Sequence, residues 1–421
     1  MTLPVLVLGA GPAGLAAAEA LSAHGQGVTI VDDNPAPGGQ LWRGGAQHWD
    51  DARAHQLWNA LRARPHVRFL GGMRAVAAGE PQRLLLDGAP GPQLLDWERA
   101  VVCSGARELL LPFPGWTLPG VTGVGGLQAM VKGGVALAGK RVVVAGSGPL
   151  LLALAATLRR HGAVVVAIAE QRSTAELARF MARLALGHRA KLLQALGLRA
   201  SLRGIPYLHA ATLRAAHGDS RLRAVQLERG GRSTSIDCDW LACGYGLVPA
   251  LETASLFDCA IEDGRVTVDA QQRSSRAGVW VAGEASGIGG VDKALAEGRI
   301  AGLAAGGFAP SARELRARAQ AQQFAALLAR SFAPGATLRG LCDDATIVCR
   351  CEDVRAQELA PHASWRAAKL QTRLGMGACQ GRVCGTACQF LYGWEAPGLR
   401  APIFPVSAAA LAAVQDSVSS K

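Results

Sequence analysis

The sequence has few lysines and few aromatic residues. Only six of its 44 basic residues are lysine, and aromatic residues occupy 5% of the 421 positions. The arginines that produce the net charge of +12 are spread along the chain, whereas a nucleic-acid site requires a basic cluster interleaved with aromatics. We therefore expect no nucleic-acid partner. The basic surface is interpreted as solvated, or as facing an acidic partner protein.

The sequence also lacks a long apolar segment. The longest apolar run, residues 149–158, is much shorter than the roughly 20 residues needed to cross a bilayer. The N-terminal stretch has neither the basic start nor the cleavage site of a signal peptide. We expect a cytoplasmic protein without a transmembrane segment, and at most a peripheral association with a membrane and its respiratory chain.

Four of the ten cysteines form two close pairs, so the cysteines do not indicate a disulfide framework. Cys349 and Cys351 are separated by one residue, and Cys379 and Cys384 are separated by four residues in a glycine-rich stretch. Such pairs can bring four thiolates together as metal ligands. On spacing alone a 2Fe-2S cluster, a structural zinc ion and unligated thiols all remain open. The irregular spacing favours the cluster, which needs one pair on each iron.

Other cysteines and the histidines suggest less chemistry. Cys388 would share a helical face with Cys384 if this stretch is helical. We interpret Cys388 as a buried thiol, and the alternative that it serves as a metal ligand stays open. Cys238 and Cys243 lie in a strand-like run away from any flavin-side loop, so we interpret them as structural and not as a redox disulfide. Cys103 is expected in the core. None of the nine histidines stands in a ligand motif.

The N-terminal stretch predicts a nucleotide site. An apolar strand at residues 3–8 is followed by a glycine turn, an alanine-rich helix to about residue 24 and a buried strand at 28–31 that ends at an acid. The first glycine permits the tight turn, the second lets the backbone approach a pyrophosphate at the helix N-terminus, and the third lets the helix pack on the strand. The acid would bind ribose hydroxyls. The predicted contacts are Gly9, Gly11, Pro12, Ala13, Gly14, Asp32 and Asp33.

A second, incomplete copy of this pattern begins at residue 140. Gly146, Gly148 and Pro149 open a turn and helix, and a strand at 164–169 ends at Glu170. Leu151 occupies the third glycine position, so the helix cannot approach its strand as closely as in a standard site. Glu170 would bind a 2'-hydroxyl and repel the 2'-phosphate of NADPH. NADH, another adenine nucleotide, or no ligand at all remain open for this domain.

Three further segments resemble those of two-dinucleotide-binding-domain flavoproteins. Residues 37–43 resemble the loop that passes beside the flavin, residues 101–107 and 112–116 resemble the crossover into the second domain, and residues 278–290 resemble the motif that closes the FAD site. The resemblance makes the first nucleotide FAD, with Glu284 accepting from ribityl hydroxyls and a helix from about Val291 directed at the flavin pyrimidine edge. The FAD contacts implied are Gly39, Gln40, Arg43, Ser104, Gly105, Gly283 and Glu284.

The order of these motifs is similar to that in the FAD-containing alpha-type subunits of heteromeric amino-acid and opine dehydrogenases. That group includes the corresponding subunits of D-hydroxyproline dehydrogenase, opine oxidase and hydrogen cyanide synthase. The C-terminal cysteine pattern resembles the bacterioferritin-associated-ferredoxin (BFD) type of 2Fe-2S domain, with Cys349, Cys351, Cys379 and Cys384 as ligands. The resemblance implies that a D-amino-acid-oxidase-like FAD subunit oxidises the substrate. A small 2Fe-2S ferredoxin-like subunit is a further candidate partner.

We therefore predict an α/β fold of two glutathione-reductase-like Rossmann domains followed by a small helical 2Fe-2S-binding domain. Helices are expected at residues 173–202 and 310–332, and strands at 222–227 and 233–241. The predicted division is an FAD-binding domain at 1–117 and 246–309, an inserted nucleotide-binding-type domain at 118–245, a helical linker at 310–334, a BFD-like domain at 335–400 and a tail at 401–421.

Three functions are compatible with these motifs. The first is an FAD and 2Fe-2S electron-transfer subunit that receives electrons from a partner oxidising an amino acid or secondary amine and passes them to a quinone or other acceptor. The second is a self-sufficient NADH-dependent reductase that feeds a partner through the cluster. The third is a non-catalytic scaffold with a zinc-bound tail. No His, Lys or paired carboxylate falls in a flavin-side motif, so no catalytic residue is assigned.

Overall fold

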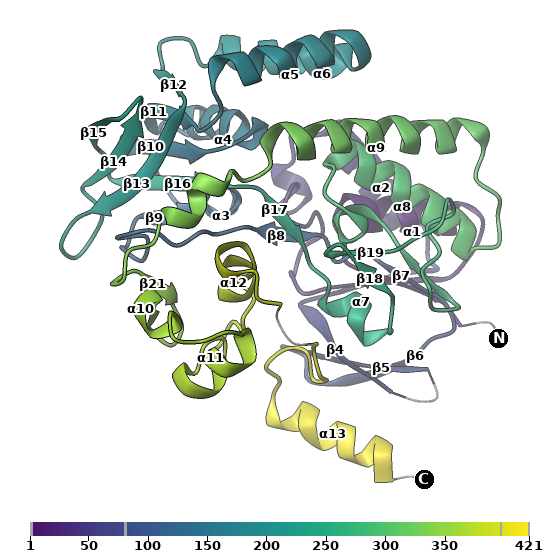
Figure 1. Cartoon of the computed structure of the whole chain (residues 1–421). Helices are drawn as coiled ribbons and strands as arrows, with labels where there is room; N and C mark the ends of the chain where they lie inside the picture. The colour runs from purple at the N-terminus through teal and green to yellow at the C-terminus, as the bar shows by residue number, and fades with distance from the viewer. Residues whose placement is uncertain (1–2, 80–81, 396–397, 420–421) are drawn as a thin grey trace. The chain divides into compact units, whose positions relative to one another are not determined.

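The computed structural model describes residues 3–79, 82–395 and 398–419. The chain forms two compact units, each built from separate stretches of sequence (Figure 1). Unit 1 comprises residues 1–107, 248–326 and 399–421, and unit 2 comprises residues 108–247 and 327–398. The chain passes between the units at the strands β8 (Ala106–Glu108) and β17 (Leu247–Pro249), along the helix α9 (Ala312–Phe332), and again after residue 398.

Unit 1 is organised around a five-stranded parallel sheet with the strand order β20-β7-β1-β2-β3. Its strands are short and apolar, so both faces can be covered. Successive side chains of β1 point to opposite faces: Val5 and Val7 belong to one core, and Leu6 and Leu8 to another. The strand bounds are β1 Val5–Leu8, β2 Val28–Asp32, β3 Val67–Gly71, β7 Ala100–Val102 and β20 Val279–Val281.

Helices cover the face that carries Val5 and Val7. The helices α1 (Pro12–Ala23) and α8 (Val291–Ala305) pack closely, because α8 presents glycines to the α1 backbone (Figure 1). A Cβ added to Gly298 would lie 2.1 Å from the carbonyl oxygen of Ala13. The other helical elements of unit 1 outside α9 are η1 Ala46–His48, α2 Ala52–Arg62, α7 Glu252–Leu256 and η2 Gly283–Ser286.

A three-stranded antiparallel sheet covers the opposite face. Leu84 and Leu86 of this sheet pack against Leu6 and Leu8. Trp97, the residue that follows the last strand of the sheet, packs there too. The sheet's outer side is covered by the C-terminal helix α13 (Ala408–Ser419), where Ala410 packs with Val76 and Leu85 (Figure 1). The strands are β4 Met73–Gly79, β5 Arg83–Gly88 and β6 Gln93–Asp96, and a small hairpin adds β18 Ile261–Glu262 and β19 Arg265–Val266.

Unit 2 contains a second five-stranded parallel sheet, with the order β12-β11-β10-β16-β9. Val142 and Val144 on one face pack with Leu151 and Leu154 of α4. The helices are α3 Val124–Lys132, α4 Pro149–Arg160, α5 Thr174–Gly187 and α6 Arg189–Ser201. The strands are β9 Val121–Gly123, β10 Arg141–Gly146, β11 Val164–Glu170, β12 Tyr207–His209 and β16 Trp240–Gly244.

One predicted strand, at residues 233–241, proves to be two. β15 (Arg232–Asp237) belongs to the antiparallel sheet β13-β14-β15, and β16 belongs to the parallel sheet. Asp239 lies between them, and its carboxylate accepts hydrogen bonds from the backbone N–H of Arg141 at 2.8 Å and from its guanidinium at 3.1 Å. The residue alternation continues through this change of sheet, so the pattern alone could not reveal it. β13 spans Ala211–His217 and β14 spans Ala224–Arg229.

The cysteine-bearing end of the chain forms the remaining part of unit 2. Its core joins Val348, Leu359 and Trp365 to the thiols of Cys349, Cys384 and Cys388. The elements are η3 Ala336–Gly340, β21 Ile347–Cys349, β22 Val354–Arg355, α10 Ala356–Leu359, α11 Trp365–Thr372 and α12 Cys384–Tyr392. Across the described residues, no helix has the length and apolar character that a bilayer span requires.

Candidate cofactor sites

The first glycine turn joins β1 to α1 in unit 1 with the close packing that the sequence pattern predicts. A Cβ on Gly14 would lie 1.7 Å from the carbonyl oxygen of Gly9, so only glycine lets the helix begin this close to the strand. A Cβ on Gly11 would meet only the Cα of Gly39, at 3.9 Å. The turn is therefore open beside the N-terminus of α1, where backbone N–H groups and the helix dipole favour an anion.

The two acids that follow β2 lie in different surroundings. Asp32 is buried and accepts hydrogen bonds from the backbone N–H of Ala10 at 2.5 Å and of Asn34 at 2.8 Å. Burial raises the pKa of the Asp32 carboxyl, and these hydrogen bonds oppose that rise. Asp33 is exposed and forms an ion pair with Arg74 at 3.1 Å. Asp32 thus lies inside the glycine turn, and Asp33 lies at its outer edge.

The loop predicted to pass beside a flavin folds back onto the first turn. The backbone N–H of Gly38 donates to the carbonyl oxygen of Ala10 at 2.8 Å, which holds the loop against the glycine turn. Arg43 donates to the Gln40 side chain at 2.7 Å and to Asn34 at 3.0 Å. The structure therefore brings Gly39, Gln40 and Arg43 beside the first fingerprint.

Residues from the crossover and from the late motif flank the same sheet. Ser104 donates from its hydroxyl to the carbonyl oxygen of Ala250 at 2.6 Å. Glu284 is half-buried and accepts from the backbone N–H groups of Gly289 at 3.1 Å and Gly290 at 2.7 Å, immediately before α8. Burial raises the pKa of Glu284, and the hydrogen bond from Gly290 opposes that rise.

A buried ion pair fastens the late motif to α8. Lys293 donates from Nζ to Glu297 Oε2 at 2.7 Å, and the side chains are 5% and 0% exposed. Lys293 also donates to the carbonyl oxygen of Gly283 at 2.8 Å, and Glu297 accepts from the hydroxyl of Ser286 at 2.8 Å. Sequence reasoning missed both residues. The signal was present, because lysine and glutamate four residues apart follow the motif directly.

The second glycine turn, in unit 2, resembles the first in its buried acid and differs from it at the third glycine position. Glu170 is buried and accepts from the backbone N–H of Gly148 at 2.9 Å and of Arg172 at 2.9 Å. Burial raises the pKa of Glu170, and these hydrogen bonds oppose that rise. Leu151 is fully buried in the core beneath α4, where the first turn has a glycine. Pro149 begins α4, as predicted.

The four predicted metal ligands lie near one another in unit 2. A Cβ on Gly377 would lie 2.3 Å from the Cβ of Cys351, so this glycine lets the loop between the two cysteine pairs close onto the first pair. Arg373 donates to the Glu352 carboxylate at 2.7 Å and ties the same two segments together. All ten cysteines are free.

The four thiols shift one another's pKa values. A hydrogen bond from the Cys384 thiol lowers the pKa of Cys349 to about 6, and one from the same thiol lowers the pKa of Cys379 to about 4. Backbone N–H groups of Gly375 and Val383 act in the same direction on Cys349 and Cys379 respectively. Sulfurs that accept backbone N–H groups suit thiolate ligands.

The thiols are neighbours in pairs and do not surround one point. Within the described part of the chain, no three Cys, His, Asp or Glu side chains converge closely enough to hold a metal ion. Cys388 is fully buried behind the set, and burial raises its pKa to about 12. The donor set therefore suits a thiolate-bound metal in its chemistry, although the four sulfurs do not form a closed site in the described part of the chain.

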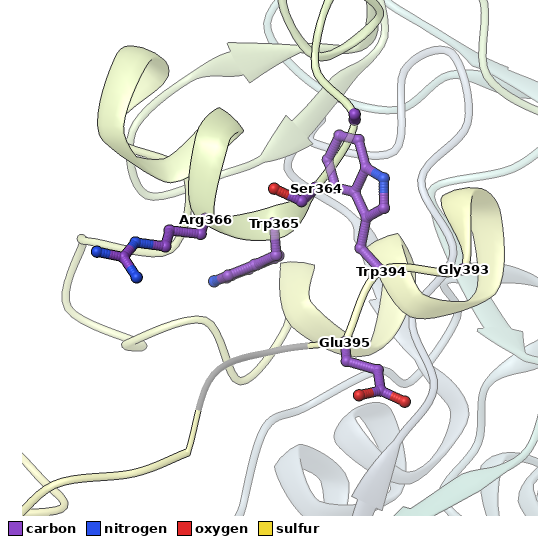
Figure 2. Close-up of a pocket in the computed structure, with 7 residues that line it drawn as sticks. Ser364, Trp365, Arg366, Gly393, Trp394 and Glu395 are labelled. Carbon is purple, nitrogen blue, oxygen red and sulfur yellow. The ribbon is translucent and has the colours of Figure 1, made fainter.

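A cavity of about 320 Å³ lies between α11 and the end of α12 (Figure 2). Figure 2 shows the indole rings of Trp365 and Trp394 beside it, contributed by different elements. Trp365 also packs against the cysteine loop, since a Cβ on Gly375 would lie 2.6 Å from its ring. The cavity is lined by Ala363, Ser364, Trp365, Arg366, Gly393, Trp394 and Glu395.

The other cysteines have no chemical partner of this kind. Cys238 and Cys243 are both buried, and burial raises the pKa of each to about 12. Cys103 is buried beside the first turn, and burial raises its pKa as well. Buried, free thiols of high pKa match the structural role predicted for these residues.

Comparison with known proteins adds the family. The profile described as "Pyridine nucleotide-disulphide oxidoreductase" matches residues 3–298, which include both glycine turns and the late motif. The chain belongs to this family. As a member it is a FAD-dependent oxidoreductase with a mixed α/β, Rossmann-type fold.

Relatives extend over nearly the whole chain. The A-type subunit of opine oxidase from Rhizobium meliloti is 33% identical, over 90% of this chain and 90% of its own length. The HcnB subunit of hydrogen cyanide synthase from Pseudomonas protegens is 31% identical, over 92% of this chain and 91% of its own length. Both relatives are named as subunits of larger enzymes. The protein is thus a flavin oxidoreductase related to these two kinds of subunit.

Solved structures confirm the fold. The structure of L-proline dehydrogenase from P. horikoshii covers 98% of this chain and 79% of its own, with a TM-score of 0.67 at 18% identity. Thioredoxin reductase of Lactococcus lactis covers 72% of this chain and 98% of its own, with a TM-score of 0.56 at 16% identity. The two-Rossmann-domain arrangement predicted from the sequence is therefore the fold of this family.

Proposed function

We propose that this protein is the FAD and 2Fe-2S electron-transfer subunit of a heteromeric dehydrogenase. A D-amino-acid-oxidase-like partner would oxidise an amino acid or secondary amine of the D-hydroxyproline, opine or glycine type. The observation that carries the proposal is that an open flavin-type glycine turn and a four-thiol group stand on one chain. Its full-length relatives, moreover, are named as subunits of opine oxidase and hydrogen cyanide synthase.

Unit 1 supplies the residues that would hold FAD. The N-terminus of α1 would receive the pyrophosphate beside Gly11, and Asp32 would receive the ribose. A bound flavin accepts two electrons and can release them singly to a one-electron acceptor. Gln40 and Arg43 lie on the loop that would border it, and Ser104, Gly105, Gly283 and Glu284 would complete the site.

The thiols of Cys349, Cys351, Cys379 and Cys384 would hold the 2Fe-2S cluster, one pair on each iron. Zinc remains the competing metal for these thiols, because it too binds four thiolates. The flavin-type site on the same chain supports the cluster, since zinc has no redox chemistry to offer it. A quinone or another acceptor would then take the electrons, directly or through a small ferredoxin-like protein.

Metal and sulfide analysis of the purified protein tests the cluster. We expect about two iron atoms and two acid-labile sulfides per chain. The Cys379→Ser variant should lose both and keep its FAD, because Cys379 and the flavin-type turn belong to different units. The Cys388→Ser variant is the matched control and should keep both iron and sulfide. One zinc per chain without iron would instead identify a scaffold with a zinc-bound tail.

Anaerobic mixing with NADH tests the electron source. We expect stoichiometric NADH to leave the flavin absorbance unchanged on the turnover timescale. Rapid bleaching would support the self-sufficient NADH-dependent reductase in place of a subunit fed by a partner. Co-expression with neighbouring genes, followed by dye reduction with D-hydroxyproline, opines, D-proline, sarcosine and glycine, would then identify the substrate.

A further inference from the structure

The two glycine turns offer a matched comparison, because Gly11 and Gly148 hold equivalent places in the two fingerprints. Each is the glycine that would face a pyrophosphate. A Cβ added to Gly11 meets only the backbone of Gly39, at 3.9 Å. A Cβ added to Gly148 meets the side chain of Phe332, with its Cγ at 3.5 Å and its Cβ and Cδ1 at 3.7 Å. The first turn is open, and the second is covered.

The residue that covers the second turn comes from the end of the linker helix. Phe332 is the last residue of α9, and unit 2 includes both it and Gly148. Its ring packs edge-on against Phe180 of α5, with the ring centroids 4.9 Å apart and the planes at 75°. Phe180 is itself 6% exposed. The phenyl group therefore sits between the glycine turn and the helix that follows β11.

Polar contacts hold the residues that follow Phe332. Arg172, just after Glu170, donates from its guanidinium to the carbonyl oxygen of Ala333. Gly335 lies near Gln171, since a Cβ built on this glycine would come within 3.9 Å of the side-chain nitrogen. The segment 332–335 thus follows the carboxyl ends of β10 and β11, the edge of a doubly wound sheet where dinucleotides bind.

The groups that a nucleotide would use at this edge are already engaged. The backbone N–H of Gly148 donates to Glu170, and the Glu170 carboxylate accepts a second N–H from Arg172. A pyrophosphate approaching Gly148 would have to displace the phenyl ring. The acid of the first turn, Asp32, likewise accepts two backbone N–H groups, so the phenyl ring is what distinguishes the second turn.

We propose that the second dinucleotide-type fold is a docking surface for the chain's own linker. Residues 332–335 occupy the edge at which a nicotinamide dinucleotide would bind, with Phe332 covering the phosphate-facing glycine. The second fold thereby anchors the linker that leads to the cysteine-bearing segment. Any nucleotide must first displace the linker, so its affinity falls by the fraction of molecules in which the linker is released. This inference goes beyond the proposed function and does not depend on the cluster.

Hydrogen exchange on the full-length protein tests the docking. The Phe332→Ala variant should raise amide exchange in residues 147–151 by about tenfold, because the turn loses its cover. Leu315→Ala is the matched control, since Leu315 is an exposed apolar residue on the same helix. An increase confined to Phe332→Ala supports the proposal. No increase, or an equal increase in the control, overturns it. Circular dichroism and FAD content should be unchanged in both variants.

Titration with NADH and AMP supplies a second readout. The wild-type protein should bind AMP and NADH only weakly, and Phe332→Ala should bind AMP at least about tenfold more tightly than the wild type does. Wild-type binding of NADH that leaves exchange of residues 332–335 unchanged would overturn the proposal, because nucleotide and linker would then occupy different places. Equal AMP affinity in the wild type and the variant would show that Phe332 is not the barrier.

Discussion

Lys293 and Glu297 form a buried ion pair, with Nζ 2.7 Å from Oε2, directly beneath the motif that would close the flavin site. Gly283 and Ser286 both bind to this pair, so the turn depends on two charges that have no access to water. When one partner of a buried ion pair is removed, the other is left as an unpaired buried charge, and this destabilises the fold. Their removal is therefore a sensitive probe of the turn.

We expect Glu297→Leu to lower the free energy of unfolding by about 3 to 5 kcal/mol, because Lys293 is left buried and unpaired by a carboxylate. The double variant Lys293→Met with Glu297→Leu should recover much of that loss, since neither charge is then stranded. Urea unfolding and the FAD content of the purified protein measure both effects. Asp96→Asn, which breaks an exposed pair with Arg83, is the control and should cost no more than about 1 kcal/mol. A double variant as unstable as the single one would contradict the interpretation.

The contact between α8 and α1 predicts opposite effects for two glycines. Gly298→Ala should destabilise unit 1 and lower its FAD retention, because the new Cβ would lie 2.1 Å from the carbonyl oxygen of Ala13. Gly197 lies in α6, is exposed, and has nothing within 4 Å of an added Cβ. Gly197→Ala should therefore stabilise the protein by roughly 0.5 to 1 kcal/mol. Thermal unfolding distinguishes the two, and a loss of stability in Gly197→Ala would refute the comparison.

Trp365 connects the cavity of Figure 2 to the cysteine loop. Trp365→Ala should remove support from the loop around Gly375 and Gly381 and accelerate loss of iron from the proposed cluster to a chelator, because a buried ring is lost at a typical cost of about 3 to 5 kcal/mol. Trp394→Ala, which removes the other indole of the same cavity, should retain iron better, since Trp394 is only partly buried against this core. Iron release followed by absorbance measures the difference, and equal release rates would argue against it.

The metal-free protein should react with iodoacetamide in an order that exposure alone does not predict. Cys351 is exposed, whereas Cys379 is half-buried, but a hydrogen bond from Cys384 lowers the pKa of Cys379 to about 4. The pKa of Cys351 lies above its ordinary value, because burial and the adjacent Cys379 outweigh a backbone hydrogen bond that lowers it.

At pH 6 the fraction of Cys379 present as thiolate therefore exceeds that of Cys351 by at least about a thousandfold. A thiolate of lower pKa is a weaker nucleophile, and this reduces the advantage of Cys379 by roughly a hundred- to three-hundredfold. Cys379 should be alkylated a few times faster than Cys351 at pH 6, and the order should reverse above the pKa of Cys351. Peptide mass spectrometry against pH measures it. Because the folded-state pKa of Cys379 is lowered, its thiolate also stabilises the metal-free fold above the unfolded pKa, and that contribution is lost as the pH falls toward 4. Faster reaction of Cys351 at pH 6 would contradict this assignment.

Local patterns predicted the backbone elements of the first glycine turn. The glycine turn, the acid after β2 and the start of α8 at Val291 all follow from short-range steric rules, in which a residue type is required by the conformation of its own neighbours. The strand predicted at residues 233–241 failed for the opposite reason. Its alternation is real, but the point at which the chain leaves one sheet for another depends on Asp239 meeting Arg141, which is 98 positions away.

The sequence by itself determined the parts: two strand-turn-helix units, two pairs of thiols, and a family of flavin oxidoreductases. Only the tertiary structure decided how these parts are used. Gly148 and Phe332 are separated by 184 positions, yet their contact closes the second turn while the first remains open. Burial makes the ion pair of Lys293 and Glu297 dependent on both of its partners. The packing of Gly377 on Cys351 brings the two thiol pairs together. The first and the last of these depend on contacts between distant segments, for which no local pattern carries a signal, whereas the spacing of Lys293 and Glu297 is local and only their burial is not.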